Sequence, residues 1–371
     1  MATRLPLRSL EIEGYRAIRQ LKIARLGQVN LFVGKNNVGK TSLLEAMRIY
    51  LSRNPRSVLA ELIRERTDYR PPPYRISRPS ERELDPDAVE AVAQGAESFF
   101  HGAFTGLWKG RVRIGPDGLS HDTLSLSLPW AEALQSRESL RIGTDLFVGP
   151  ESPLVEIEIE GEKSALPFDA LLRRVPLARA SRRSGVIYIP ASGFDPPRLA
   201  ALWNEAASER RAGDVEHALR SIVPDLERVQ LLGDSGAPGR SVTLELREGT
   251  RPIPLRSMGD GVNRVFGIAL AMVQAEDGAV LIDEAENGLH YSVQEEVWRA
   301  VLSLAHHLNV QVFATTHSWD CIQAFAAAAN DSAEVNGMLH RIENRGRDTL
   351  RVVEMTEKDL ALVARQRIEV R

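Results

Sequence analysis

The first fifty residues switch from strand-like to helix-like patterning. Apolar residues recur at roughly every second position from Leu10 to Ile23, around a turn signal at Gly14, and this spacing predicts a pair of strands. The continuous apolar run at residues 29–33 predicts a third, buried strand, and residues 43–47 are patterned like a helix. We therefore expect a strand, a glycine-rich loop and a helix in direct succession.

Short apolar runs in the second half of the chain predict the buried strands of a parallel sheet. They lie at residues 185–190, 279–284 and 310–314, and helical spacing separates them. The end of the chain predicts a closing hairpin and a last helix capped by Thr356 and Asp359. The other expected elements are helices at residues 198–212, 214–226 and 262–275, and hairpins pairing 241–246 with 252–255 and 338–342 with 350–353.

Between these two parts the periodicity is irregular. Three consecutive prolines at residues 71–73 break any helix, a helix candidate runs from Pro86 to Leu107, and alternating residues then predict short strands near 111–114, 124–128 and 155–160. We expect a main domain made of residues 1–54 and 185–371, and an insertion lobe at 55–184 that is helical and then β-rich. Its aromatic residues are expected to form a core rather than a platform for bases: Phe99, Phe100, Phe104, Trp108 and Trp130.

Composition narrows the function classes. The chain has 371 residues, of which 43% are hydrophobic and 26% charged, so it can bury a sizeable core. Its one cysteine, Cys321, excludes an internal disulfide and a cysteine-cluster metal site. The first residues lack the apolar core of a signal peptide, and no apolar run reaches the roughly 18 residues needed to span a bilayer. We expect a cytoplasmic protein with no membrane segment.

A net charge of −3 gives no overall attraction to nucleic acid, so any such contact requires a local patch. Two arginine-rich stretches are candidates for nucleic-acid binding, and each is equally explained as a solvated surface. The first contains Arg53, Arg56, Arg64, Arg66 and Arg70, and the second contains Arg173, Arg174, Arg179, Arg182 and Arg183.

The glycine-rich loop at residues 34–42 fits the pattern G-x-x-x-x-G-K-[ST] in the strand-to-helix context that this motif requires. Its backbone N–H groups and the start of the helix are expected to cradle phosphates, while Lys40 reaches the β- and γ-phosphates and the Thr41 hydroxyl ligates Mg²⁺. The alternative is a glycine-rich turn without a ligand. The residues assigned to binding of a nucleoside triphosphate are Gly34, Asn36, Asn37, Val38, Gly39, Lys40, Thr41 and Ser42.

Two further segments supply the chemistry that a phosphate-hydrolysing site needs. The apolar run at 279–282 ends in Asp283 and Glu284, which are expected to hold Mg²⁺ and to activate the attacking water. His317 follows the apolar run at 310–314, where it is a candidate γ-phosphate sensor. Chance carboxylates at an exposed strand end are the alternative interpretation for the acidic pair.

Residues 257–261, Ser-Met-Gly-Asp-Gly, open a helix and form a second candidate anion site through Ser257, Gly259 and Gly261. Because one protomer rarely needs two phosphate cradles, we expect this segment to close on the nucleotide of another copy in a head-to-tail homodimer. A plain helix cap at Ser257 explains the segment equally well by itself.

The order of these motifs resembles the ABC-type ATPases of the SMC/RecF/OLD (overcoming lysogenization defect) group. The runs 255–263, 282–291 and 313–318, with residues 368–371, look like a bacterial OLD-like stand-alone ATPase subfamily. The resemblance covers residues 8–50 and 185–371 well and the insertion loosely. It implies an α/β fold, namely an ABC-type P-loop ATPase head with mixed sheets and a small α+β insertion lobe.

The resemblance also implies roles. Residues 34–42 correspond to the Walker A motif, 257–261 to the signature, Asp283 and catalytic Glu284 to the Walker B motif, and His317 to the switch histidine. The signature is not Leu-Ser-Gly-Gly-Gln, which argues against a transporter. OLD nucleases carry a TOPRIM nuclease domain, but no Asp-x-Asp pair follows His317, so we expect no cleavage chemistry in this chain.

We therefore predict an enzyme, an ATPase that uses ATP and Mg²⁺ and that dimerises as a switch for a partner protein, by resemblance a separate TOPRIM-like nuclease in phage defence. One alternative is a RecF-like repair ATPase that binds DNA directly. Another is an ATP-gated scaffold that does not hydrolyse ATP.

Overall fold

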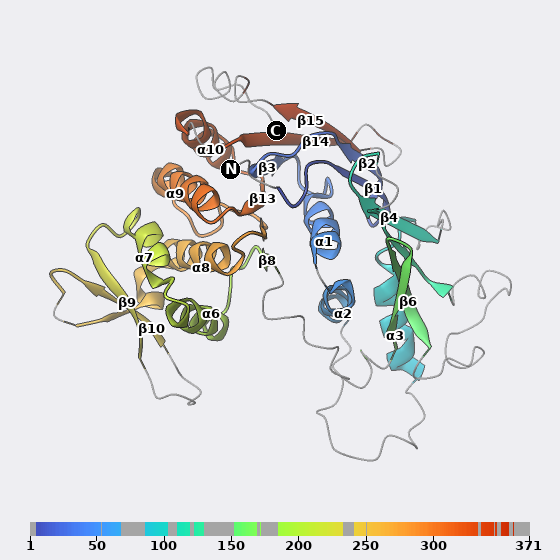
Figure 1. The fold of residues 1–371 in the computed structure, drawn as a ribbon, viewed down its shortest axis with the longest axis horizontal. Helices are drawn as coiled ribbons and strands as arrows, with labels where there is room; N and C mark the ends of the chain where they lie inside the picture. The colour runs from blue at the N-terminus through green and yellow to red at the C-terminus, as the bar shows by residue number, and fades with distance from the viewer. Residues whose placement is uncertain are drawn as a thin grey trace, which may run out of the picture.

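The computed structural model describes residues 5–52, 54–67, 86–102, 110–118, 122–129, 152–168, 171, 185–232, 241–249, 251–332, 335–344, 346, 350–355 and 359. In these residues the strands form three sheets, which Figure 1 shows with their covering helices. Two strands from opposite ends of the described chain are neighbours: β2 (Ile18–Ile23) lies against β15 (Leu350–Met355).

The central sheet carries the buried strands expected from the apolar runs. Neighbouring strands within this sheet run parallel, except that β15 pairs antiparallel with β14 (Gly337–Asn344). Strands that are covered on both faces read as continuous apolar runs, and β3, β12 and β13 are buried throughout. In sheet order the strands are β15 (Leu350–Met355), β14 (Gly337–Asn344), β3 (Val29–Val33), β13 (Gln311–Thr316), β12 (Ala279–Ile282) and β8 (Val186–Ile189).

Helices cover both faces of the central sheet. Helix α1 (Lys40–Leu51) packs on one face, and α8 (Asp260–Gln274), α9 (Gln294–His307) and α10 (Trp319–Asp331) lie on the other (Figure 1). Because side chains alternate along a strand, consecutive residues of β3 belong to different cores: Leu31 packs with α8 to α10, and Phe32 with α1. The sheet thereby separates the two hydrophobic cores.

The second sheet is antiparallel and joins the N-terminal hairpin to the insertion. Strands β1 (Leu10–Tyr15) and β2 (Ile18–Ile23) confirm the predicted pair, and β1 pairs on its other edge with β4 (Arg111–Gly115). The sheet continues through β5 (Leu124–Ser127), β6 (Pro153–Ile159) and β7 (Glu162–Pro167), with α2 (Pro55–Arg66) and α3 (Pro86–Glu97) packed on it. The strands of segment 55–184 therefore share a sheet and a core with β1, β2 and α1, while the domain boundaries themselves stay a prediction.

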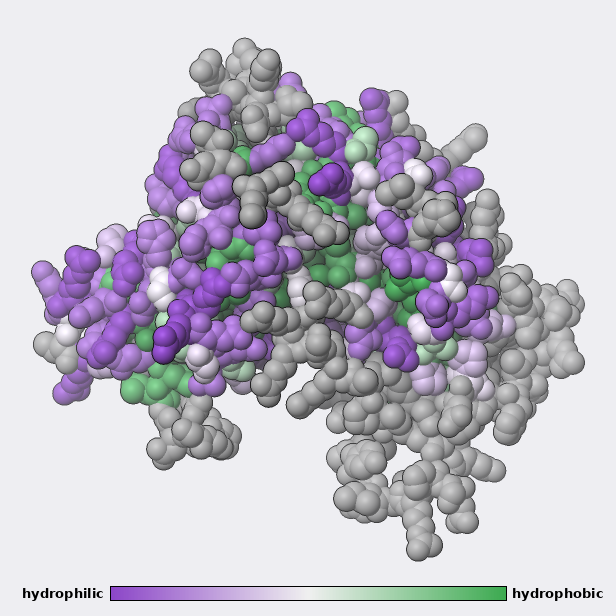
Figure 2. Space-filling model, viewed as in Figure 1, coloured by the Kyte–Doolittle hydropathy of each residue, from purple (hydrophilic) through white to green (hydrophobic). Residues whose placement is uncertain are grey.

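A third, small sheet lies beside α6 (Pro196–Ser208) and α7 (Ala212–Arg220). It contains β9 (Leu226–Leu232), β10 (Ser241–Leu246) and β11 (Ile253–Pro254). Figure 2 shows mostly hydrophilic residues over this part of the molecule. The buried apolar residues of α6, α7, β9 and β10 belong to the same core as those of α8.

Several predicted elements need correction. The helix expected from Pro86 to Leu107 ends at Glu97, and the next residues form a turn and a bridge between Phe100 and Tyr15. The helix expected at 214–226 ends at Arg220, because Leu226 already begins β9, a strand that the pattern did not predict. Phe99 and Phe100 are buried as predicted, whereas Phe104, Trp108, Trp130 and most of the last predicted helix lie outside the described residues.

Candidate functional site

The predicted phosphate loop connects β3 to α1. Gly39 caps α1 with a φ of 101°, a left-handed conformation that favours glycine. Gly34 has no space for a side chain, because a Cβ there would lie 2.8 Å from the Ile342 carbonyl oxygen. Lys40 is buried and donates from Nζ to the carbonyl oxygens of Gly34 (2.7 Å) and Lys35 (3.0 Å).

Burial lowers the pKa of Lys40, while three carboxylates beyond the loop oppose this shift. These carboxylates are Glu286, Asp283 and Glu284, which all follow β12. The cationic loop and the acidic strand end thus face each other, as parallel strands that end at one edge of a sheet allow.

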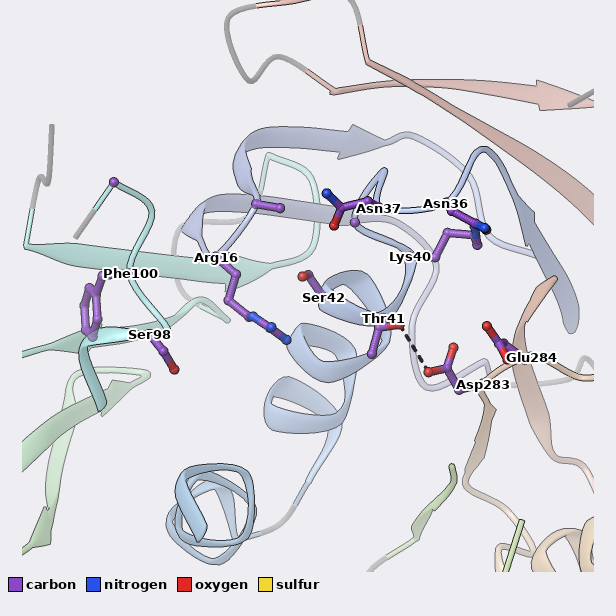
Figure 3. A pocket seen from close by; sticks show the side chains of 13 residues that line it. Arg16, Asn36, Asn37, Lys40, Thr41, Ser42, Ser98, Phe100, Asp283 and Glu284 are labelled. Carbon is purple, nitrogen blue, oxygen red and sulfur yellow. Dashed lines mark hydrogen bonds between the residues drawn. The ribbon is translucent and has the colours of Figure 1, made fainter. Parts of the chain in front are cut away.

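Asp283 accepts hydrogen bonds from three hydroxyl groups, one of which is that of Tyr188 at 3.5 Å from Oδ2. Its Oδ2 accepts from the Thr41 hydroxyl at 3.2 Å, the contact drawn as a dashed line in Figure 3, and its Oδ1 accepts from the Thr315 hydroxyl at 2.6 Å. The structure thus brings together the two residues predicted to hold a metal. A hydroxyl and a carboxylate oxygen are ligands that Mg²⁺ prefers, so this pair fits a magnesium ion.

Glu284 has a φ of 47°, in the left-handed region that a residue with a side chain rarely adopts. Its N–H donates to the Thr315 hydroxyl (2.9 Å), and its Oε2 accepts from Asn287 Nδ2 (2.6 Å). A strained backbone of this kind costs about 1–3 kcal/mol and persists only where its surroundings hold it. Glu284 is therefore positioned by its neighbours, and Figure 3 shows its side chain next to that of Asp283.

His317 lies directly after β13, with its ring 45% exposed. Its Nδ1 is 3.8 Å from Glu284 Oε1 and 3.1 Å from Glu286 Oε1. The buried Glu286 also accepts the N–H groups of His317 and Ser318, so it fixes the main chain that carries the histidine. The two residues predicted to be catalytic, Glu284 and His317, are therefore neighbours.

The loop, Asp283 and Glu284 border a cavity of about 680 Å³, which His317 does not line. The phosphate loop forms one wall, with Asp283 and Glu284 beside Thr41, and Figure 3 shows Arg16, Ser98 and Phe100 on the side away from these carboxylates. Six of the eight predicted loop residues line it, whereas Gly34 and Val38 do not. The lining residues are Arg16, Ala17, Asn36, Asn37, Gly39, Lys40, Thr41, Ser42, Ser98, Phe100, Gly102, Asp283 and Glu284.

The far wall of the cavity joins the β1–β2 turn to the segment after α3. The Arg16 N–H donates to the Phe99 carbonyl (2.9 Å), and the His101 N–H donates to the Gly14 carbonyl (2.8 Å). The Arg16 guanidinium is anchored to Glu45 of α1 at 2.6 Å. No pattern in the sequence placed Ser98 or Phe100 beside Arg16.

The segment 257–261 does not line the cavity. It consists of the short helix η2 (Leu255–Met258), Gly259 with a φ of 90°, and the first residues of α8. The N-cap of α8 is Gly259, so Ser257 is not the capping residue. Ser257 and Gly259 are exposed, while Gly261 packs close to the Gly288 carbonyl oxygen.

The arginine-rich stretches are only partly described. Arg53, Arg70 and the whole second stretch lie outside the described residues, which include Arg56, Arg64 and Arg66 on α2. Arg66 is mostly buried and is paired with Glu45. In the described part of the chain no helix is long and apolar enough to cross a membrane, and no group of three or more His, Cys, Asp or Glu side chains could hold a metal ion.

Comparisons with known proteins support a nucleotide-binding fold. Residues 160–320 match a family described as "AAA domain, putative AbiEii toxin, Type IV TA system", and residues 6–91 match the family described as "AAA ATPase domain". An uncharacterized protein of Methanocaldococcus jannaschii is 40% identical over 60 residues, which is 16% of this chain and 27% of that protein. An ATP/GTP phosphatase of Helicobacter pylori is 31% identical over 83 residues, 22% of each chain.

Two solved structures share the fold over nearly the whole chain. One is an SMC head bound to the C-terminal winged-helix domain of ScpA, with a TM-score of 0.54 and 11% identity, covering 96% of this chain and 99% of that one. The other is an Smc head with an extended coiled coil bound to the C-terminal domain of ScpA, derived from Pyrococcus furiosus, with a TM-score of 0.52 and 9% identity over 98% and 99%. The predicted α/β head fold with mixed sheets is confirmed. Both matched family models describe AAA-type ATPase domains.

Proposed function

We propose that this protein is a Mg²⁺-dependent ATPase that works as a dimeric switch for a partner protein. The observation that carries the proposal is the contact between Thr41 of the phosphate loop and Asp283 at the end of β12, with Glu284 next to it. A glycine-rich turn without a ligand would not need a buried lysine facing three carboxylates. The arrangement suits hydrolysis of a phosphoric anhydride.

Each residue has a defined task in this proposal. The N–H groups of the loop and the Lys40 ammonium bind the β- and γ-phosphates, and Thr41 with Asp283 would hold Mg²⁺, which supplies positive charge to the phosphate oxygens when bound. Glu284 orients the attacking water and accepts its proton, since its carboxylate borders the cavity beside Asp283. His317, 3.8 Å from Glu284, senses the γ-phosphate.

Dimerisation is proposed from the position of segment 257–261. Its exposed residues do not line the cavity of their own protomer, yet small residues at a helix start suit an anion. Two copies arranged head to tail would place this segment on the nucleotide held by the other copy's loop. Ser257, Gly259 and Gly261 would then complete a site that one protomer leaves open.

A partner protein is proposed as the output of the switch. The fold matches include heads bound to ScpA, and one matched family is described by a toxin of a type IV toxin–antitoxin system. Binding of a second protein by these heads favours a protein partner for this chain as well. A TOPRIM-like nuclease in phage defence as that partner stays what the resemblance to OLD-like ATPases implies.

Steady-state hydrolysis tests the enzymatic part. We expect ATP turnover in the wild-type protein with Mg²⁺, loss of nucleotide binding in Lys40→Ala, and retained binding with at least 100-fold lower kcat in Glu284→Gln. Lys22→Ala, an exposed lysine of β2 paired with Asp117, serves as the matched control and should behave like the wild type. GTP is tested in parallel. Normal turnover by Lys40→Ala or Glu284→Gln would refute the assignment.

Light scattering tests the dimer. The mass of Glu284→Gln should double on addition of ATP and Mg²⁺, because closed copies cannot reopen by hydrolysis. Ser257→Arg should bind nucleotide but remain monomeric, and mixing it with Lys40→Ala should restore part of the activity through one intact composite site. An unchanged mass of Glu284→Gln, or a dimer formed by Ser257→Arg, would argue against closure through this segment.

A further inference from the structure

Arg264 lies in α8, shortly after the signature segment, and only 5% of its surface is exposed. Its guanidinium donates to main-chain carbonyl oxygens that follow two adjacent strands. Nη1 donates to Pro190 (2.8 Å) and Ala191 (3.5 Å) after β8, and Nη2 donates to Asp283 (2.7 Å) and Glu284 (2.9 Å) after β12. One side chain thus connects three elements that meet beside the candidate site.

Burying this cation is unfavourable. Desolvation lowers the pKa of Arg264, opposed by the carboxylates of Glu286, Asp283 and Glu284, and its Nε has no hydrogen-bond partner. A leucine or methionine could fill the same volume without this cost. Packing alone therefore does not explain the arginine. Its hydrogen-bond acceptors show that it holds the main chain at Asp283 and Glu284.

That main chain needs support. Glu284 has a φ of 47°, and its carbonyl oxygen accepts both the Arg264 guanidinium and the Asn287 N–H (3.0 Å). The Asn287 side chain in turn donates to Glu284 Oε2 (2.6 Å) and to the Ala191 carbonyl oxygen (3.2 Å), which Arg264 also contacts. Arg264 and Asn287 thus both hold the main chain at Glu284, and Asn287 also holds its carboxylate.

The start of α8 is also in direct contact with the loop. A Cβ on Gly261 would lie 3.2 Å from the Gly288 carbonyl oxygen, and one on Gly288 would lie 3.1 Å from the Asp260 Cβ. Side chains at either glycine would force the two segments apart. The signature segment and the loop 284–288 are therefore in close contact, with Arg264 as the polar link between them.

We propose that Arg264 is a positioning residue that fixes the backbone of Glu284 and joins it to the signature helix. The proposal rests on the proposed ATPase function. In the proposed dimer, segment 257–261 of one protomer contacts the nucleotide held by the phosphate loop of the other copy. Through Arg264, this contact would change the orientation of Glu284 in the first protomer, which acts on the nucleotide in that protomer's own loop. Arg264 itself touches neither nucleotide.

The test compares Arg264→Met and Arg264→Lys with Val273→Ala, a buried position near the other end of the same helix. Arg264→Met keeps the volume and removes all donors, so kcat should fall 10- to 100-fold while KM changes less than threefold, as expected for a misplaced group rather than a lost phosphate contact. Arg264→Lys can reach only one of the two strand ends and should recover part of kcat. Val273→Ala should lower the stability and leave kcat near the wild-type value.

Hydrogen exchange of the amides of residues 284–288 provides a readout that does not depend on turnover. Exchange there should be faster in Arg264→Met than in the wild type and in Val273→Ala. ATP should slow it in the wild type and in Val273→Ala, but not in Arg264→Met. A kcat within twofold of wild type, or unchanged exchange at 284–288, in both arginine variants would overturn the proposal. If the wild-type protein hydrolyses no ATP, the proposed function fails, and the exchange measurement alone then decides whether Arg264 holds this loop.

Discussion

His340 should make the strand that carries the phosphate loop sensitive to acid. It lies on β14, fully buried, and its ring stacks on Phe32 of β3 with ring centroids 4.9 Å apart. Its Nε2 is 3.1 Å from Asn30 Oδ1, while its Nδ1 has no hydrogen-bond partner. Because Asn30 Oδ1 is an acceptor, Nε2 carries the proton, and protonation of Nδ1 would bury an unpaired charge.

Burial lowers the pKa of His340 to about 3, from an ordinary value of 6.5. Between these two values the unfolded chain binds a proton that the folded protein does not, so stability falls as the pH falls. The contribution is fully present above pH 6.5. With 1.36 kcal/mol per pH unit over the range from 6.5 to 5.0, the free energy of unfolding should fall by about 2 kcal/mol between pH 7.5 and 5.0.

Urea unfolding of the wild type and of His340→Gln at both pH values isolates this contribution, because all other titrating groups cancel in the difference between the two proteins. The stability difference should change by about 2 kcal/mol between pH 7.5 and 5.0, with the variant losing less. Ile342→Val, buried on the same strand, is the control and should differ from the wild type by the same amount at both pH values. A difference between wild type and His340→Gln that does not depend on pH would refute the reasoning.

Three further outcomes are expected. Glu45→Gln removes the carboxylate that binds one tyrosine and two arginines, and should lower the free energy of unfolding by on the order of 3 kcal/mol in urea titrations; a loss below 1 kcal/mol would contradict this. Burial raises the pKa of Cys321 to about 12, so a thiol reagent at pH 8 should label it in urea far faster than in the folded protein, and equal rates would contradict its burial. Asn287→Ala should reduce kcat about tenfold with little change in KM, whereas a rise in KM alone would show a role in binding.

The central sheet and the order of its motifs could be predicted because both have local signals. An apolar run such as 279–282 marks a buried strand, and the residues that follow it must reach the sheet edge where the phosphate loop lies. The meeting of Thr41 with Asp283 follows from that topology. Site residues that lie at strand ends or in a glycine-rich loop can therefore be predicted from the sequence.

The far wall of the cavity, which contains Arg16, Ser98 and Phe100, could not be predicted in this way. Ser98 and Phe100 reach it because segment 55–184 adds β4 to the free edge of β1, and the turn after α3 bonds to the β1–β2 turn. Pairing of strands nearly one hundred residues apart leaves no periodic signal in either strand. The insertion therefore shapes the candidate cavity, although its sequence alone indicated only a separate lobe.

Arg264 could not be found from its sequence position for a different reason. Its partners are main-chain carbonyl oxygens, which every residue has and no residue type reveals. Asp283 and Glu284 have the same local pattern whether or not a guanidinium holds their backbone. Side chains that act on the backbone of another residue become visible only when the fold brings them together. In the proposed dimer, the contact between Arg264 and Glu284 is also where one nucleotide site would influence the other.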